Sequence, residues 1–280
     1  MRKNILTALG YLAFFIFSFL LSLYWTFDAN HIVKPRLISE ALKLGYQIEI
    51  PDALEKYRLS GVQSRNVVLK TPFFATPVKI EEIKARLSLL PLVLGRQSVK
   101  FSATLYDGTL SGKVVEGKKS RVLDLEAKNI DLSKMQPGKE NSLWVMAKLS
   151  GKADLNLTPK DDPKKWKGQI TAKFGPGKLP AFMYHGFQVP EVKLNAVNLN
   201  VSVLSGKADI KTLEVKSPDL PCEGKGEIQL DAALKSSQIQ FRAKIDPSPE
   251  FMGKVPTLQG LLPPDKNISY NGNLAAILGP

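Results

Sequence analysis

The sequence predicts a mostly β protein: a single N-terminal transmembrane helix, then a long, twisted antiparallel sheet built from repeated hairpins, with one or two short helices. Three observations lead to this prediction. An apolar run without charge covers residues 4–27, apolar and polar side chains alternate from residue 48 almost to the end, and a short glycine-bearing motif recurs inside the alternating part. Strands with one apolar and one polar face are typical of antiparallel sheets. A helix-rich or parallel α/β fold is therefore disfavoured.

The apolar run 4–27 follows a short tip, residues 1–3, that we expect in the cytoplasm. At about 1.5 Å per helical residue the run spans roughly 36 Å, enough to cross a hydrocarbon core of about 30 Å. Tyr24 and Trp25 lie at its far end, where interfacial aromatic anchors are expected. A cleaved signal peptide is the alternative, but its apolar region would be about 7–15 residues long and would end at a small-x-small site. The run is longer and offers no such site, which favours an uncleaved anchor.

The charges around this run indicate its orientation. Arg2 and Lys3 precede it directly, which favours an N-terminus in the cytoplasm, and about 250 residues follow it. We expect a bacterial inner-membrane protein with a single pass and its C-terminal body in the periplasm. Cys222 is the only cysteine, so no intrachain disulfide can form. We interpret it as a semi-buried strand or turn residue.

Residues 28–47 read as a linker with a short amphipathic helix over 33–45. Leu37, Ile38 and Ala41 fall on one side of that helix, and Gly45 can cap it. A second helical-looking piece covers residues 51–57.

Residues 48–280 form one β-rich body without a clear internal linker. In residues 99–105 apolar side chains alternate with Lys100, Ser102 and Thr104, and Asp107-Gly108 then gives a hairpin signal. The hexapeptide Leu-Ser-Gly-Lys-Ala-Asp occurs at 149–154 and at 204–209, with a partial copy at 110–115. The two full copies are each followed by a variable stretch and then by Lys-Gly-Gln-Ile at 167–170 or Lys-Gly-Glu-Ile at 225–228. We expect each such unit to form a strand, a glycine-bearing bend and a return strand.

The formal charge of +13, from 39 Lys+Arg and 26 Asp+Glu, suggests an anionic partner. Phospholipid headgroups, acidic proteins and nucleic acid are the classes to consider. Nucleic-acid binders usually concentrate their charge in a stripe interleaved with aromatic residues. Here most lysines recur singly along the strands, so we expect no nucleic-acid partner.

Residues for chemistry are sparse. His31 and His185 lie far apart, and no nucleophile elbow, phosphate-binding loop or dinucleotide fingerprint is present. The adjacent carboxylates Asp161-Asp162 and Glu81-Glu82 are typical of solvated charge. We therefore expect neither catalytic residues, nor a metal site, nor a cofactor, and an enzyme of unrecognised type is the weakest hypothesis.

One stretch resembles a known family. Residues 206–220 and 224–230, with the runs GKADI, LEVKSPDL and GKGEIQL, are similar to the type II secretion system protein N (GspN) family, within the wider AsmA-like group. The likeness is specific over about 204–245 and general elsewhere. It implies an accessory inner-membrane component of the type II secretion machinery without catalytic residues, and an extended, curled sheet like that of AsmA-like lipid-handling proteins.

Two functional hypotheses follow. The first is a non-catalytic assembly or scaffold role beside other secretion-system proteins, with partners recognised through edge strands and basic faces. The second is lipid binding or lipid transfer, with phospholipid acyl chains in an apolar groove on the concave face of the sheet. Eight residues would line that groove: Val99, Phe101, Leu105, Leu123, Leu125, Val201, Val203 and Phe241. An ordinary closed core formed by the same residues is the alternative.

Overall fold

The computed structural model describes residues 29–43, 45–58, 60–71, 76–88, 91, 95–135, 145–159, 162–184, 187–231, 236–256 and 262–273. The predicted transmembrane run and its anchors Tyr24 and Trp25 lie outside these residues. None of the helices formed by the described residues has the length and apolar character that a membrane span needs.

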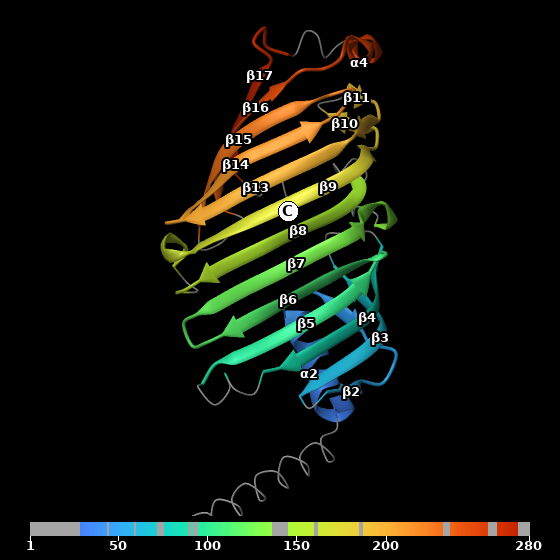
Figure 1. The fold of residues 1–280 in the computed structure, drawn as a ribbon, viewed down its shortest axis with the longest axis vertical. Helices are drawn as coiled ribbons and strands as arrows, with labels where there is room; N and C mark the ends of the chain where they lie inside the picture. The colour runs from blue at the N-terminus through green and yellow to red at the C-terminus, as the bar shows by residue number, and fades with distance from the viewer. Residues whose placement is uncertain are drawn as a thin grey trace, which may run out of the picture.

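One large antiparallel sheet dominates the fold (Figure 1), which confirms the prediction of a mostly β protein. Its strands are β1 (Gln47–Glu49), β2 (Glu55–Tyr57), β3 (Gly61–Lys70), β4 (Val78–Leu87), β5 (Gln97–Leu105), β6 (Gly108–Glu116), β7 (Arg121–Asp131), β8 (Met146–Leu157), β9 (Lys167–Leu179), β12 (Val192–Leu194), β13 (Ala196–Leu204), β14 (Lys207–Lys216), β15 (Cys222–Gln229), β16 (Gln238–Ile245) and β17 (Asn267–Asn273). The remaining elements are the helices α2 (Ala29–Lys43) and α4 (Pro249–Lys254), the 3-10 turns η1 (Leu132–Lys134) and η2 (Pro163–Lys165), and a separate ribbon of β10 (Phe182–Tyr184) and β11 (Phe187–Val189).

The sheet is a meander in which strand order largely follows chain order. From β3 to β9 and from β13 to β17, each strand pairs with the one that follows it in the chain. The exception in the middle is the ribbon β10–β11, after which β12 and β13 both pair with the long strand β9. The strands stack like rungs along the long axis of the molecule, with β2–β4 and α2 near one end and β16 and β17 near the other (Figure 1).

Tight turns join several of the rungs. Tyr106 and Asp107 have φ of 49° and 61°, and they connect Leu105 to Gly108, which face each other across β5 and β6. Two consecutive positive φ values are typical of the type I′ turn that suits the twist of a two-residue hairpin. The predicted hairpin is therefore present, with its turn one residue earlier than the Asp107-Gly108 signal.

Each copy of the hexapeptide leads into an antiparallel return strand, as predicted, since β6 pairs with β7, β8 with β9 and β14 with β15; the hexapeptide itself, however, does not form the same structure in each copy. Only the copy at 204–209 makes a turn, through Ser205 (φ 52°) and Gly206 (φ 81°). The copies at 110–115 and 149–154 lie within β6 and β8. Gly151 lies in the middle of β8, where a Cβ would overlap the Thr171 carbonyl oxygen of β9. The glycine therefore permits a close approach of the two backbones.

Helix α2 confirms the predicted linker helix and begins four residues earlier. Gly45 (φ 81°) follows its end, and the Gly45 and Tyr46 N–H groups donate to the carbonyl oxygens of Leu42 and Ala41 at 3.0 and 2.9 Å. The Asn30 side chain ties the helix to the sheet, since its Oδ1 accepts from Leu54 N–H at 2.6 Å.

The second predicted helix, over 51–57, is wrong. Residues Glu55–Tyr57 form β2 and pair with β3 in antiparallel register. Leu54 beside them is buried at 6% exposure. Pairing with the following strand thus outweighs a weak local helical period.

The apolar core is divided along the sheet. Its buried residues form four clusters: Ile50, Leu54 and Val67; Val78, Ala103, Leu105, Ile130 and Met135; Val201, Val203 and Ala208; and Val189, Val192, Leu194, Val197, Phe251 and Val255. Val33 of α2 contacts the first cluster, and Phe251 of α4 is fully buried in the last. The two helices therefore cover separate parts of one face.

Candidate functional site

The apolar face of the sheet can be traced residue by residue from the strand register. Residues directly opposite in antiparallel neighbours share a face, so consecutive pairs define rows that cross the sheet. One row, the central apolar row, runs from β3 to β17. Its members are Val62, Ala85, Phe101, Gly112, Leu125, Ala153, Ile170, Val201, Ile210, Gly226, Phe241 and Tyr270.

A second apolar row lies two residues along each strand on the same face and runs from β4 to β17. Its members are Leu87, Val99, Val114, Leu123, Leu155, Gly168, Val203, Ala208, Ile228, Ile239 and Gly272. Every member of both rows is apolar, glycine or tyrosine. The face is therefore a continuous apolar band across the sheet.

All eight residues proposed from the sequence lie on this face. The central row holds Phe101, Leu125, Val201 and Phe241, and the second row holds Val99, Leu123 and Val203. Leu105 follows Phe101 by four residues on the regular strand β5, so it points to the same side. Their role as the lining of a groove stays a prediction.

Burial divides the eight residues into two groups. Leu105, Val201 and Val203 are buried and belong to core clusters. The other five are half-buried and belong to none of the four clusters: Val99, Phe101, Leu123, Leu125 and Phe241. The helices that cover the face contact clusters on other strands, on β3 and on β12 and β13. Over β5–β8 the members of the two rows are thus partly accessible to solvent, beside the buried cluster around Leu105 and Ile130.

Glycines keep the band shallow. A Cβ at Gly112 would lie 2.7 Å from Leu125 Cδ2 and 3.1 Å from Phe101 Cε1, and a Cβ at Gly224 would overlap the Phe241 ring. Both aromatic rings therefore lie against a glycine on the neighbouring strand, an arrangement that also shields the glycine backbone. The two glycines add no side chain of their own to the band.

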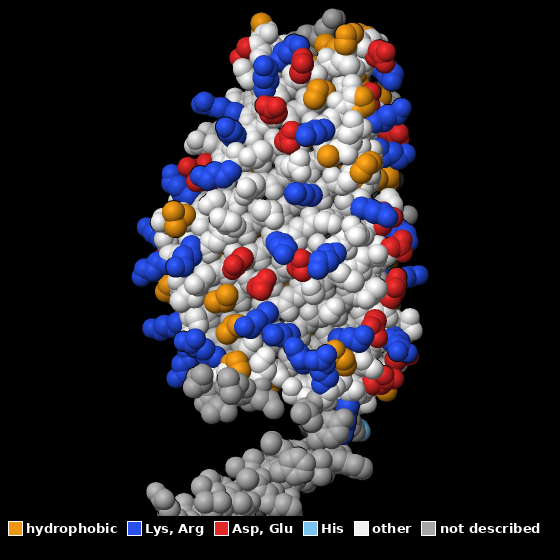
Figure 2. Space-filling view, viewed as in Figure 1, with side chains coloured by type: hydrophobic (Ala, Val, Ile, Leu, Met, Phe, Trp, Pro, Cys, Tyr) orange, Lys and Arg blue, Asp and Glu red, His pale blue; other side chains and the backbone are white. Residues whose placement is uncertain are grey.

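The opposite face of the sheet is polar. Asp124 and Lys152, for example, lie directly next to Leu125 and Ala153 in sequence and are exposed on the other side. Figure 2 shows one face of the molecule, with acidic and basic side chains scattered across the middle of the sheet. The two faces of the sheet thus offer opposite chemistry to a ligand.

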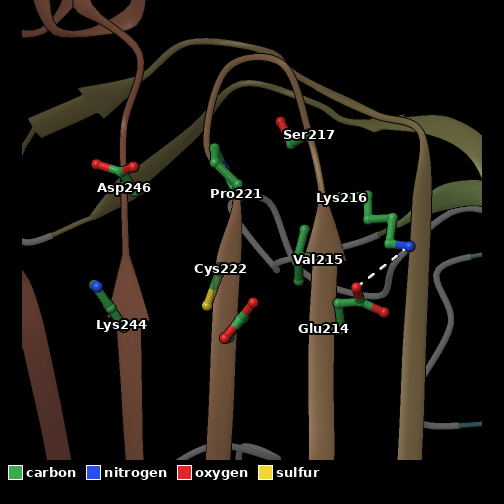
Figure 3. Close-up of a pocket in the computed structure, with 9 residues that line it drawn as sticks. Glu214, Val215, Lys216, Ser217, Pro221, Cys222, Lys244 and Asp246 are labelled. Carbon is green, nitrogen blue, oxygen red and sulfur yellow. Dashed lines mark ion pairs between the residues drawn. The ribbon is translucent and has the colours of Figure 1, made fainter.

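A second feature is a depression of about 330 Å³ at the ends of β14, β15 and β16 (Figure 3). It is lined by Glu214, Val215, Lys216, Ser217, Pro221, Cys222, Glu223, Lys244 and Asp246. Lys216 reaches towards Glu214, 3.3 Å between Nζ and Oε1, and Cys222 lies on the neighbouring strand. The depression mixes charges of both signs with one thiol.

The electrostatics of this depression argue against an activated nucleophile. Hydrogen bonds from Asn198 and Lys216 hold the pKa of Glu214 below its ordinary value, and a hydrogen bond from Lys266 does the same to the pKa of Asp246. Burial, and then the charge of Glu223, raise the pKa of the Cys222 thiol. At neutral pH the two carboxylates are ionised and the thiol is protonated, and a protonated thiol is a weak nucleophile and a poor metal ligand.

Cys222 is half-buried at the first position of β15, in agreement with its interpretation as a semi-buried strand residue. Among the described residues there is no group of three or more His, Cys, Asp or Glu side chains that could hold a metal ion. The depression at β14–β16 was missed by sequence reasoning because its lining residues come from two hairpins and show no spacing pattern. The other members of the two rows, such as Ala153 and Ile170, were also missed, because the register that aligns neighbouring strands cannot be read from one strand alone.

Comparison of the chain with protein-family models, with curated proteins and with solved structures finds no match.

Proposed function

We propose that this protein is a non-catalytic lipid-binding or lipid-transfer protein of the bacterial inner membrane. The apolar band of its sheet takes up phospholipid acyl chains, and the N-terminal apolar run anchors the protein in the membrane from which the lipid comes. The resemblance to the AsmA-like group supports the same proposal.

The observation that supports it best is the continuity of the two apolar rows. They cross the sheet without a charged member, and over β5–β8 their side chains are half-buried. A monomeric protein rarely leaves a continuous apolar band without a cover, because its exposure to water is unfavourable. Neighbouring strands lie about 4.8 Å apart, close to the width of an extended acyl chain, so chains can lie along the band as well as across it.

Site-specific photocrosslinking in intact cells tests this proposal with the full-length protein. The photoreactive residue p-benzoylphenylalanine replaces Leu125 in one variant and Thr171, on the polar face of β9 and away from β4–β6, in the control. The proposal predicts a phospholipid adduct, detected by mass spectrometry, at Leu125 and none at Thr171. Equal labelling at the two positions, or none at Leu125, would contradict it.

Blocking the band provides a second arm. Ile170→Glu places a charge in the central row, whereas Gln169→Glu places the same charge on the polar face of the same strand. We expect Ile170→Glu to abolish lipid adducts at Leu125 and Gln169→Glu to leave them intact. Far-UV circular dichroism of both variants shows whether the sheet is retained.

A second candidate function is the scaffold role in the type II secretion system that the GspN resemblance implies. The observation in its favour is the edge strand β17. Among the described residues, β17 pairs with β16 on one side and with no strand on the other, and it exposes Ile268 and Tyr270 at 39% and 36%. An open edge with exposed apolar side chains can bind a partner by strand addition.

The same photoreactive residue at Ser269 on β17 tests this role, with Thr171 in the middle of the sheet as control. In cells that carry a type II secretion system, the scaffold role predicts a protein adduct at Ser269 that contains a secretion component. Adducts with lipid alone, or equal protein adducts at Thr171, would remove its support.

A further inference from the structure

The polar face carries a row of three cations that form no ion pair with any of the described residues. Arg86 on β4 lies directly opposite Lys100 on β5, and Lys100 lies directly opposite Lys113 on β6. Directly opposite residues have Cβ atoms about 5 Å apart, and like charges in such positions destabilise a sheet. We name these three residues the basic stripe.

Other basic residues near the stripe do form ion pairs with acidic side chains. Lys84 forms an ion pair with Glu82, Lys128 and Lys152 each lie 3.1 Å from a Glu126 carboxylate oxygen, and Arg121 lies 2.8 Å from Glu116. In the part of the chain that the structure describes, no ion pair or side-chain hydrogen bond is found for the basic stripe. The repulsion between these cations is therefore not relieved by an ion pair among the described residues, even with Asp124 opposite Lys113, and an external anion would relieve it.

The surroundings of the stripe suit a lipid interface. Tyr57 on β2 continues the same row, since Gly61 faces both Tyr57 and Arg86. The Arg58 guanidinium and the Lys84 ammonium lie 5.4 and 5.9 Å from the centre of the Tyr57 ring. Tyrosine beside cations is typical of the headgroup region of a membrane. On the other side, Asp124 on β7 ends the stripe.

The basic stripe also lies at the end of the sheet from which the predicted membrane anchor would extend. Strands β4–β6 are on the same half of the sheet as α2, with which the described chain begins (Figure 1). On the face shown in Figure 2, basic side chains gather over this end of the sheet. The apolar run 4–27 directly precedes α2 in the sequence. An anchored protein would hold this end close to the membrane, and such tethering raises the effective concentration of headgroups at the stripe.

We propose that the basic stripe docks the polar face of β4–β6 on anionic phospholipid headgroups of the membrane that holds the anchor. This inference rests on the proposed membrane location, but not on acyl-chain binding by the opposite face. Phospholipid fits better than nucleic acid because the stripe is short, whereas stable binding of nucleic acid commonly uses six to ten phosphate contacts. Each cation near an anionic membrane surface changes the docking equilibrium about fivefold, so the three together contribute roughly a hundredfold.

The test uses the full-length protein reconstituted in vesicles of phosphatidylethanolamine and phosphatidylglycerol, or of phosphatidylcholine alone. The photoreactive residue replaces Ser111, two positions before Lys113 on the polar face, or Thr171 on the same face of β9 as control. We expect phospholipid adducts at Ser111 in the phosphatidylglycerol vesicles only, and none at Thr171. Because surface charges are screened, the adducts should decrease as salt rises from about 0.05 to 0.5 M.

Charge removal completes the test. The triple variant Arg86→Gln, Lys100→Gln, Lys113→Gln should lower Ser111 adducts about a hundredfold, because the docking contribution is lost. A control variant removes three other exposed lysines of the polar face, Lys173→Gln, Lys225→Gln and Lys244→Gln, and should leave them unchanged. Retained adducts at Leu125 in the triple variant show that the sheet is folded and that the two proposals are separable.

Three results would overturn the proposal. They are equal Ser111 adducts in phosphatidylcholine vesicles, no decrease in the triple variant, or an equal decrease in the control variant. Labelling at Ser111 that occurs only when an acidic protein or a nucleic acid is added would overturn the proposal as well, because that result assigns the stripe to another class of partner.

Discussion

Two phenylalanines of this protein allow a direct comparison of covered and uncovered apolar surface. Phe251 of α4 is 0% exposed and packs among Val192, Leu194 and Val197. Phe101 of β5 is half-buried, lies over Gly112 and belongs to no core cluster. Truncation to alanine removes the same atoms at both positions, so the difference in cost reports the environment of the ring.

The two substitutions should differ about twofold or more in their cost to the free energy of unfolding. Phe251→Ala leaves a cavity beneath α4 and should cost about 3–5 kcal/mol of unfolding free energy. Phe101→Ala loses only the burial of a ring that is partly accessible, and leaves no enclosed cavity, so about 1–2 kcal/mol is expected. Urea denaturation of the full-length variants in detergent micelles, followed by far-UV circular dichroism, measures both values.

Lipid binding should show the opposite order. Phe101→Ala removes apolar contact surface from the band and should decrease the phospholipid adducts at Leu125. Phe251→Ala should leave these adducts largely unchanged under conditions where the variant is folded. If Phe101→Ala proves as costly to stability as Phe251→Ala, the ring lies in a closed core, and the reasoning about an open band is refuted.

Three further predictions follow from individual side chains. Because burial raises the pKa of the Cys222 thiol, alkylation by iodoacetamide should be slow at pH 7 and should accelerate only at a higher pH than for a free thiol; mass spectrometry of the alkylated chain measures this, and rapid reaction at pH 7 would contradict it. Lys100→Thr removes the middle charge of the basic stripe and should stabilise the sheet by about 0.5–1 kcal/mol, seen as a rise of about 2–4 °C in Tm in the absence of anionic lipid; a lower Tm would show that Lys100 has a compensating contact. A hydrogen bond from Ser133 holds the pKa of Asp131 below its ordinary value, so the contribution of this carboxylate is present at neutral pH and is lost as the pH falls through the lowered pKa. Asp131→Asn should therefore lower Tm at pH 7 but not near pH 2, and a pH-independent effect would argue against this role.

The sequence predicted the strands well wherever one face of the strand is buried. The alternation around Phe101, Leu125, Val201 and Phe241 placed these residues on a common side, because a period of two is a direct consequence of strand geometry. The register between strands was not predictable in the same way. It depends on extra residues, such as Asn129 with φ of 53°, which shifts the pairing of β7 with β8.

Local motifs were less informative than tertiary pairing. The same six residues are a turn at 204–209 and mid-strand at 149–154, because the neighbours across the sheet decide which conformation is favourable. Residues 51–57 carry a weak helical period, yet β3 recruits Glu55–Tyr57 as β2. The basic stripe was also invisible in sequence, since Arg86, Lys100 and Lys113 come together only through the register of three strands.

The most direct measurement for the central claim is an experimental structure of the full-length protein determined in lipid nanodiscs. If phospholipid is the ligand, elongated density should lie against the central apolar row between β5 and β9, within van der Waals contact of Phe101, Leu125 and Ile170. A map in which other parts of the chain close over these three side chains, with no space for an acyl chain, would contradict the account.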